Sequence, residues 1–256
     1  MNLESLCNDL LAERAESLGF LDEVGDDWGL ATPAAGWSVL DQITHLAWVD
    51  EAAAMAIVDP DAFCEMRDHG RRVVESVVEA SRLENATRSN VDTRQWLVDA
   101  GHALISAARS APAGIRVPWF GPNMTVASSM TARIMETWAH TQDIVDAIGA
   151  TRVATARLRH VAFIGWRALP FSFAANQRLA PSDPVRVELG EITLGPDDAA
   201  NVVRGSALDF CLLVTQRRHL ADTDLRAQGP VAAEWLTIAQ AFAGPPGMGR
   251  QPGQFG

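Results

Sequence analysis

The chain has 256 residues, 48% of them hydrophobic, and a formal net charge of −11. This length allows one large domain or two, and the hydrophobic content is enough to bury a sizeable core. A protein with a sequence pI of 4.9 repels phosphate backbones and anionic membrane surfaces, so nucleic acid and membranes are not expected partners.

The first twenty residues do not have the pattern of a signal peptide. Glu4, Asp9, Glu13 and Glu16 lie among their apolar positions, where a signal peptide has a basic start and an unbroken apolar centre. Elsewhere no apolar run approaches the roughly 20 residues that a membrane-spanning helix needs. We therefore expect a cytoplasmic protein.

Helical spacing of apolar residues predicts most of the first two thirds of the chain to be helical. Ser38 and Asp41 indicate a capping box at one helix start, and Gly149 indicates a helix end. The expected helices cover residues 3–19, 38–58, 60–85, 92–110, 125–148 and 154–178. The first five form a bundle of long helices.

After residue 180 the pattern changes to short strands. Alternating residues predict strands at 185–189 and 191–194, with a third in NVVRG, and helices at 206–218 and 229–243 finish the chain. The sequence thus predicts the α+β class, with a helical domain over residues 1–178 and a small α/β domain with a short antiparallel sheet over 179–256. The tail of this second domain, GPPGMGRQPGQFG, is too rich in Gly and Pro for regular structure.

The segment RVPWFGPNMTVAS interrupts the helices and predicts a surface loop. Its Trp119 is a candidate pocket wall that binds a cofactor. The alternative is that Trp119 and Phe120 only cover the end of the bundle, as aromatic side chains commonly do in packing.

The remaining cysteines and histidines are assigned to packing or to solvated surfaces. The three cysteines, Cys7, Cys64 and Cys211, are far apart in apolar surroundings, which favours reduced thiols over disulfides. Three histidines each have an Arg neighbour and are expected on solvated faces. They are His69, His160 and His219.

The stretch RIMETWAHTQDIVDAIG contains two candidate metal ligands. Glu136 and His140 are one turn apart, so both side chains project from the same helix face. They supply two ligands of a divalent metal, and His45 is a candidate third ligand because it lies in the middle of another apolar helix. Two His and one Glu leave a coordination position open, as in catalytic zinc sites. Spacing alone also allows an ordinary contact on a helix surface.

Two segments, ATPAAGWSVLDQITHLA and TARIMETWAHTQDIVDAIG, together resemble the mycothiol-dependent maleylpyruvate isomerase family, within the DinB-like metal-binding helical bundles. In that family an N-terminal four-helix bundle carries the metal, and His45, Glu136 and His140 fall on its three metal-ligand positions. Further matching residues are Thr32, Pro33, Gly36, Trp37, Asp41, Leu46, Arg133, Trp138, Asp143 and Gly149.

The resemblance extends to the C-terminal part, which is similar to the small α/β (SCP2-like) domain of these proteins. The sequence of this part also resembles an actinobacterial subgroup labelled with wyosine base formation. That label would require tRNA binding, and an acidic chain without a basic patch is a poor tRNA binder. The family places an Arg toward its active site, and Arg217 is the nearest equivalent, with Arg218 as the alternative register.

The resemblance implies an enzyme that holds a divalent metal, Zn²⁺ above all, and uses the thiol mycothiol. It predicts isomerisation of a small electrophilic substrate, or thiol transfer to it, with Arg217 holding a substrate carboxylate or enolate. Two alternatives stay open: a thiol-independent metal hydrolase or lyase, and a metal- or ligand-binding protein without catalysis. The partners are then small molecules, and the protein is a monomer or a homodimer.

Two carboxylates are candidates to orient a metal-bound His from behind. Asp41 either does so or only completes the cap with Ser38. Asp143 either does so, or is solvated, or contacts the second domain.

Overall fold

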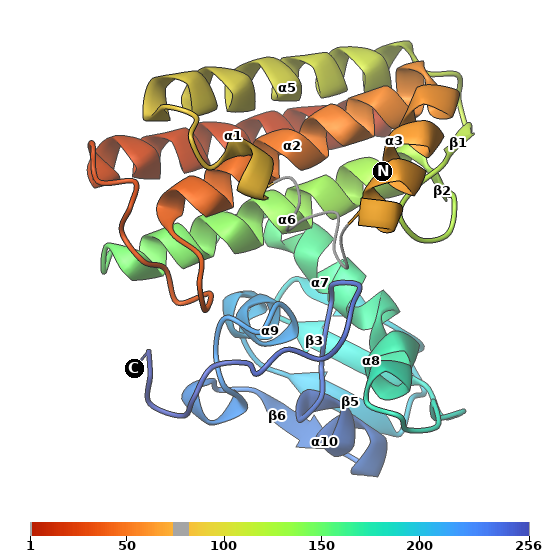
Figure 1. The fold of residues 1–256 in the computed structure, drawn as a ribbon. Helices are drawn as coiled ribbons and strands as arrows, with labels where there is room; N and C mark the ends of the chain where they lie inside the picture. Colours follow the sequence, from red (N-terminus) through yellow and green to blue (C-terminus); the bar gives the residue numbers. More distant parts are fainter. Residues whose placement is uncertain (1, 74–81, 256) are drawn as a thin grey trace. The chain divides into compact units, whose positions relative to one another are not determined.

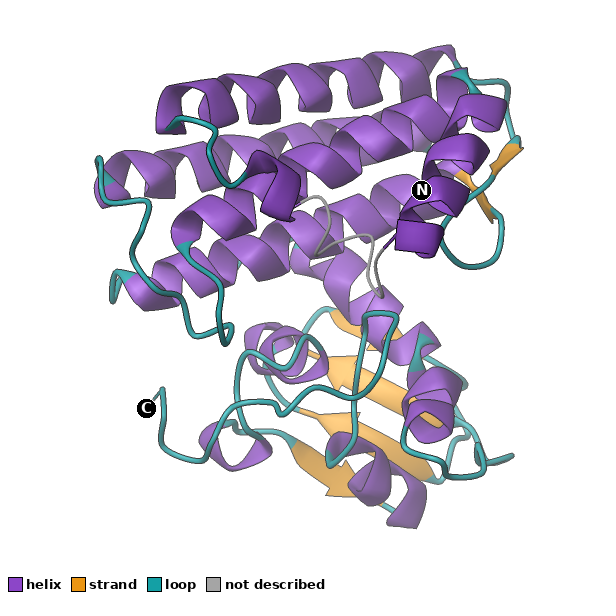
Figure 2. Cartoon of the chain, viewed as in Figure 1, coloured by secondary structure: helices purple, strands orange, loops and turns teal. Residues whose placement is uncertain are grey.

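The computed structural model describes residues 2–73 and 82–255, and the chain divides into two compact units, Met1–Arg152 and Val153–Gly256 (Figure 1). The division falls well before the predicted boundary at residue 178. The reason is that the segment after Arg152 packs with the C-terminal elements: the Trp166 indole donates to the Val185 carbonyl at 2.9 Å. Both units are helical in part, and the sheet that completes the expected α+β class lies in the second (Figure 2).

The first unit is built on long helices close to those predicted. They are α1 (Leu3–Val24), α2 (Val39–Val58), α3 (Pro60–Val73), α5 (Asn90–Ser110) and α6 (Val126–Ala147). Helix α1 runs beyond its predicted end near residue 19. The helix predicted over 60–85 is seen as α3 and as a helical segment at 82–85, and its middle lies outside the described residues.

Four of these helices pack together around two clusters of buried apolar side chains. Helix α2 contacts α5 and α6, and α1 also contacts α5 and α6, so each of these four helices packs on two of the others, while α3 packs on α2. Small residues on α2, among them Ala52, Ala53 and Ala56, are buried and allow close approach. Leu10, Leu104 and other large side chains fill the space between the helices, and burying each one contributes about 1.5–3 kcal/mol. This packing gives α2 and α6 a fixed register.

The predicted cap of α2 is present. The Asp41 N–H donates to the Ser38 hydroxyl at 3.3 Å, and the Asp41 carboxylate accepts from the Ser38 N–H at 2.8 Å. The predicted loop before α6 contains a short antiparallel ribbon, β1 (Arg116–Val117) and β2 (Met124–Thr125), which the proline and glycine signals did not reveal.

In the second unit the helix predicted over 154–178 is two helices, α7 (Leu158–Arg167) and α8 (Leu169–Ala175). The break occurs because Pro170, in the first turn of α8, has no N–H to continue the ladder. Another prediction was wrong here: His160 is fully buried rather than solvated. Its side of α7 packs into the unit, and the neighbouring arginine did not indicate that.

The sheet has the order β4–β3–β5–β6, with β3 (Val185–Leu189), β4 (Ile192–Leu194), β5 (Asn201–Arg204) and β6 (Arg226–Gln228). The predicted strands 185–189 and 191–194 do pair antiparallel. The sheet is nevertheless mixed and not wholly antiparallel, because β3 pairs with β5 in parallel. Strand β6, whose three residues are all exposed, was not predicted, since it has no apolar alternation.

The last two helices are shorter than predicted: α9 spans Ala207–Val214 and α10 spans Pro230–Leu236, with a 3-10 turn, η1, at Leu220–Asp222. Beyond the end of α10, where a longer helix was predicted, the N–H groups of Gln240 and Ala241 donate to the Ser172 hydroxyl and the Val214 carbonyl. Within the described parts of the chain, no helix is long and apolar enough to cross a membrane.

Candidate metal centre

The packing of α2 against α6 brings the three predicted ligand residues together. Both His45 Nε2 and His140 Nε2 lie 3.3 Å from Glu136 Oε2. The ring centroids of the two histidines are 4.5 Å apart. In the described part of the chain these three residues form a group that could hold a metal ion, with one ligand atom from each lying within 4.8 Å of the others.

The orientation of His140 is set by a chain of hydrogen bonds that the sequence did not suggest. His140 Nδ1 is 2.5 Å from Gln42 Oε1, and Gln42 Nε2 donates to the Thr32 hydroxyl at 2.9 Å. Thr32 in turn donates to the Trp37 carbonyl at 2.8 Å, which leaves its oxygen to accept from the Gln42 amide. The amide oxygen of Gln42 therefore faces His140 and accepts from Nδ1–H.

This chain fixes the tautomer of His140. With the proton on Nδ1, the lone pair of Nε2 is directed at the Glu136 side of the ring. Metal-bound histidines are oriented in this way by a partner behind the ring. Gln42 is fully buried on α2, one turn before His45, so one helix supplies both a candidate ligand and the group that orients another.

Trp37 packs on both imidazole rings. Its ring stacks on that of His140, at 5.8 Å and 24°, and meets that of His45 edge-on at 5.5 Å. The turn that carries it is closed by the Thr32 N–H, which donates to the Trp37 carbonyl at 2.8 Å. Trp37 thus limits the rotation of the rings and shields one side of them from water.

Protonation favours cation binding in this cluster. Burial, with a smaller contribution from His140, lowers the pKa of His45 to about 4, so the ring is neutral at pH 7. Burial raises the pKa of Glu136, but the close contacts of its carboxylate with His140 and His45 outweigh this and hold that pKa well below its usual value. The cluster therefore presents a carboxylate and neutral imidazole, which are ligands of divalent transition metals.

The cluster is partly exposed and contains one ring nitrogen without a hydrogen-bond partner among the described residues. His45 Nδ1 is buried and has no hydrogen-bond partner among the described residues. The side chains of His45, Glu136 and His140 keep 10%, 25% and 15% of their surface exposed, so the cluster is reachable from solvent. These residues fit a divalent cation.

A buried ion-pair network anchors the helices behind the cluster. Arg133, one turn before Glu136, donates to Asp50 at 2.8 Å, and Arg14 from α1 pairs with the same carboxylate. All three side chains of the network are nearly fully buried. Burial lowers the pKa of Arg133 to about 10, so it is still charged at pH 7. Asp50 therefore ties α1 and α6 to α2.

The two carboxylates considered as supports for the histidines differ in their surroundings. Asp41 completes the cap with Ser38, and its other oxygen accepts from Arg82 at 3.2 Å, so the capping alternative explains it. Asp143 is fully buried, which excludes the solvated alternative, and its supporting role stays a prediction.

The other predicted site residues lie elsewhere. The Trp119 ring stacks on the Phe63 ring, with centroids 5.7 Å apart, and packs against the helical core. This agrees with the alternative in which Trp119 serves packing. Arg217 belongs to the second unit, where its guanidinium donates to the Thr215 carbonyl at 2.7 Å. The cofactor-binding role of Trp119 and the catalytic role of Arg217 stay predictions.

Comparison with known proteins assigns the chain to a family. Residues 10–145, slightly more than half of the chain, match the family described as mycothiol maleylpyruvate isomerase N-terminal domain. The chain belongs to this family. All three cluster residues fall inside the matched range, which confirms the resemblance that their two motifs indicated.

The chain is also similar to two relatives from Mycobacterium tuberculosis. They are Rv0036c of strain H37Rv and MT0041 of strain CDC 1551, both named as uncharacterized proteins. Each is 45% identical over 231 residues, covering 88% of this chain and 90% of the relative.

The fold is shared with a solved structure, the crystal structure of the mycothiol-dependent maleylpyruvate isomerase. It aligns with a TM-score of 0.62 and 16% identity over 90% of this chain and 95% of that one. A mutant of that enzyme with one His replaced by Ala aligns equally well, at 15% identity. At this identity the likeness shows the fold alone, and it extends over both units.

Proposed function

We propose that the chain is a metal-dependent enzyme of the mycothiol type, which isomerises a small electrophilic substrate or transfers the thiol to it. The observation that carries this proposal is the convergence of His45 Nε2, His140 Nε2 and Glu136 Oε2 at one point of the helical unit. Membership of the family and the solved isomerase that shares the fold support the choice of mycothiol as thiol.

The three residues would hold the cation, for which Zn²⁺ is the first choice, because two imidazoles and a carboxylate suit it and leave a fourth position open. When bound, the cation supplies a deprotonated, nucleophilic thiolate at neutral pH, whereas a free thiol with pKa near 8.5 is mostly protonated.

The chain's own residues prepare the site for this chemistry. Gln42 holds the proton on His140 Nδ1, so the Nε2 lone pair of that ring is available without a proton being lost. The depressed pKa values of His45 and Glu136 keep both groups in their binding form at pH 7. Trp37 excludes water from one side of the rings.

Arg217 is proposed to bind a substrate carboxylate or enolate. A guanidinium offers two parallel N–H groups to a carboxylate, and it stays charged throughout the physiological pH range. In this role it contributes to turnover and not to metal retention.

The experiment compares the purified protein with two variants. Elemental analysis and a mycothiol titration should find about one metal ion per chain and saturable thiol binding. His140→Ala should lose both, whereas Arg217→Ala should keep the metal and lose turnover only. A metal-loaded protein that neither binds mycothiol nor needs it for any reaction would favour the hydrolase alternative instead.

A further inference from the structure

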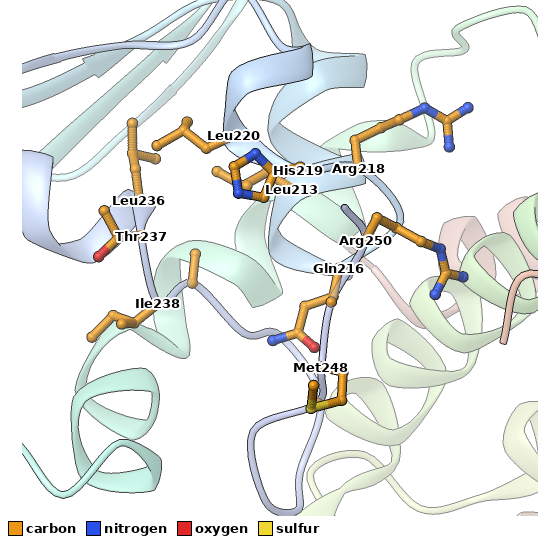
Figure 3. A pocket seen from close by; sticks show the side chains of 13 residues that line it. Leu213, Gln216, Arg218, His219, Leu220, Leu236, Thr237, Ile238, Met248 and Arg250 are labelled. Carbon is orange, nitrogen blue, oxygen red and sulfur yellow. The ribbon is translucent and has the colours of Figure 1, made fainter. Parts of the chain in front are cut away.

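A cavity of about 300 Å³ lies in the second unit, and its lining residues fall between positions 213 and 250 (Figure 3). Leu236 and Ile238 form part of its wall, whereas the guanidinium groups of Arg218 and Arg250 point away from it. The described residues that line this cavity therefore direct no charged group into it that would select a ligand.

Buried charged groups lie instead next to the candidate metal centre, in the first unit. Arg14 on α1 and Arg133 on α6 each bind one oxygen of the Asp50 carboxylate on α2. Arg14 also donates from Nη2 to the Leu97 carbonyl on α5. The three charged residues, which we call the Asp50 network, thus join all four helices that pack together.

Both guanidinium groups of the Asp50 network depend on its one carboxylate. Burial, with a smaller contribution from the charge of Arg133, lowers the pKa of Arg14 to about 9, so both arginines are charged at pH 7. Two buried cations repel each other at short distance, and the carboxylate that binds both of them offsets this repulsion. The position of α6 relative to α1 and α2 is therefore tied to Asp50.

Three polar contacts between α2 and α6 follow one another in antiparallel order. The pairs are Asp50 with Arg133, His45 with Glu136, and Gln42 with His140, at 2.8, 3.3 and 2.5 Å. Successive members are three and four residues apart on α6 and five and three apart on α2, which corresponds to about 4.5–7.5 Å along the helices. The contact between the candidate ligands is therefore flanked by the Gln42 amide on one side and by the Asp50 network on the other.

Gly101 gives Arg14 the room to reach Asp50. It is buried in the interior of α5, where glycine is less favourable than alanine. A Cβ added at Gly101 would overlap the guanidinium of Arg14. The network therefore explains the glycine in this helix, and α5 contributes to the position of Arg14 through it.

We propose that the Asp50 network positions the metal ligands, because it fixes the register in which α6 presents Glu136 to His45. The Gln42 amide orients the ring of His140, whereas the network sets where along α2 the carboxylate of Glu136 lies. The members of the network act through Glu136 and are positioning residues. Their effect on zinc binding rests on the proposed metal site, whereas their effect on the geometry of the ligands does not.

The geometry is tested by NMR on the metal-free protein. The ring centroids of His45 and His140 are 4.5 Å apart, so their imidazole protons should show a nuclear Overhauser effect (NOE). Asp50→Asn removes the charge but keeps the size of the side chain, and it should reduce this NOE to less than about half. An undiminished NOE in Asp50→Asn would overturn the proposal.

Glu13→Gln is the matched control. Glu13 is also a buried carboxylate with a buried arginine partner, Arg152 at 2.6 Å, but this bond joins α1 to the segment after α6 and not to α2. The variant should lower stability and leave the NOE unchanged. A loss of the NOE in both variants would mean that any buried ion pair has this effect, and it would overturn the specific role of the Asp50 network.

A second test compares zinc affinity in two glycine variants, by competition with a chromophoric chelator. A cavity of about 220 Å³ beside Arg14 gives its displaced guanidinium room, so Gly101→Ala is expected to fold. Gly101→Ala should bind zinc about tenfold more weakly, although Gly101 is not a ligand. Gly19→Ala, in the interior of α1, meets nothing within 4 Å and should keep the affinity of the unmutated protein. Equal affinities in the two variants would overturn the proposal.

The two tests separate this inference from the proposed function. If the unmutated protein bound no zinc, the proposed function would be wrong, and the NOE alone would decide on the Asp50 network. If Asp50→Asn were less stable but bound zinc as tightly as the unmutated protein, the network would be structural only and this inference would be wrong.

Discussion

Gln42→Ala tests how the candidate metal centre is oriented. The substitution removes the acceptor of the His140 Nδ1–H and the donor to Thr32, while leaving all three proposed ligands in place. His140 then loses the partner that fixes its tautomer and ring orientation. Because Gln42 is fully buried, water does not simply replace the amide.

The size of the effect follows from that contact. Removal of the partner behind a metal-bound His lowers affinity about 10–100-fold, which corresponds to roughly 1.4–2.7 kcal/mol. A buried donor left without a partner costs about 1–3 kcal/mol in the free energy of unfolding. Zinc affinity, measured by competition with a chromophoric chelator, should fall by this factor, and urea unfolding of the metal-free protein should show the loss of stability.

Gln142→Ala is the matched control. Gln142 is also a buried Gln on a long helix, 4% exposed, but its amide donates to Asp146 at 2.8 Å, whereas the partners given for His45 and His140 in the described part of the chain are Glu136 and Gln42. Its loss should lower stability without changing zinc affinity. If Gln42→Ala bound zinc as tightly as the unmutated protein, the orienting role of Gln42 would be refuted. The assignment of the three proposed ligands would not be affected by that result.

Three further outcomes are expected. Asp50→Ala leaves Arg14 and Arg133 buried without their shared carboxylate and should cost about 3–5 kcal/mol in urea unfolding, whereas an effect below 1 kcal/mol would contradict the network. Gly195→Ala should lower the melting temperature, because Gly195 has φ +92° and a Cβ there would lie 2.5 Å from a backbone carbonyl; an unchanged value would argue against that turn. The free energy of unfolding of the metal-free protein should fall by up to about 3 kcal/mol as the pH falls from 6.5 to 4. The pKa of His45 is about 4 in the folded protein and about 6.5 in the unfolded chain, so the unfolded chain is protonated first. His45→Gln should make the free energy of unfolding depend less on pH in this range.

Local patterns determined the elements of the helical unit. Apolar spacing and the Ser38–Asp41 capping box predicted α2, and the start and end of α6 were also close to prediction. The pair Glu136 and His140 could be placed on one helix face because that relation depends only on the 3.6-residue repeat. These features are decided within one or two turns of chain, so a single sequence is enough to find them.

Other features depend on groups that are distant along the chain. Gln42 looked like an ordinary polar residue of α2, and only the packing of α2 against α6 shows that it meets His140. The end of α10 and the exposed strand β6 were missed for the same reason, because hydrogen bonds to other elements decide them. His160 was misjudged from its neighbour in sequence, whereas burial depends on the face that packs.

The sequence by itself determined the helix faces, the two motifs and the family they indicate. The tertiary structure decided which of the predicted residues meet: His45 joins Glu136 and His140, whereas Trp119 packs on Phe63. It also decided the division at Arg152, because α7 is as helical as the bundle and only its contacts with the C-terminal elements assign it to the second unit. The physical reason is the distance along the chain over which each effect acts. Helix propensity and periodicity act within one helix. The convergence of side chains from two helices depends on their relative register, which the packing of their buried faces sets.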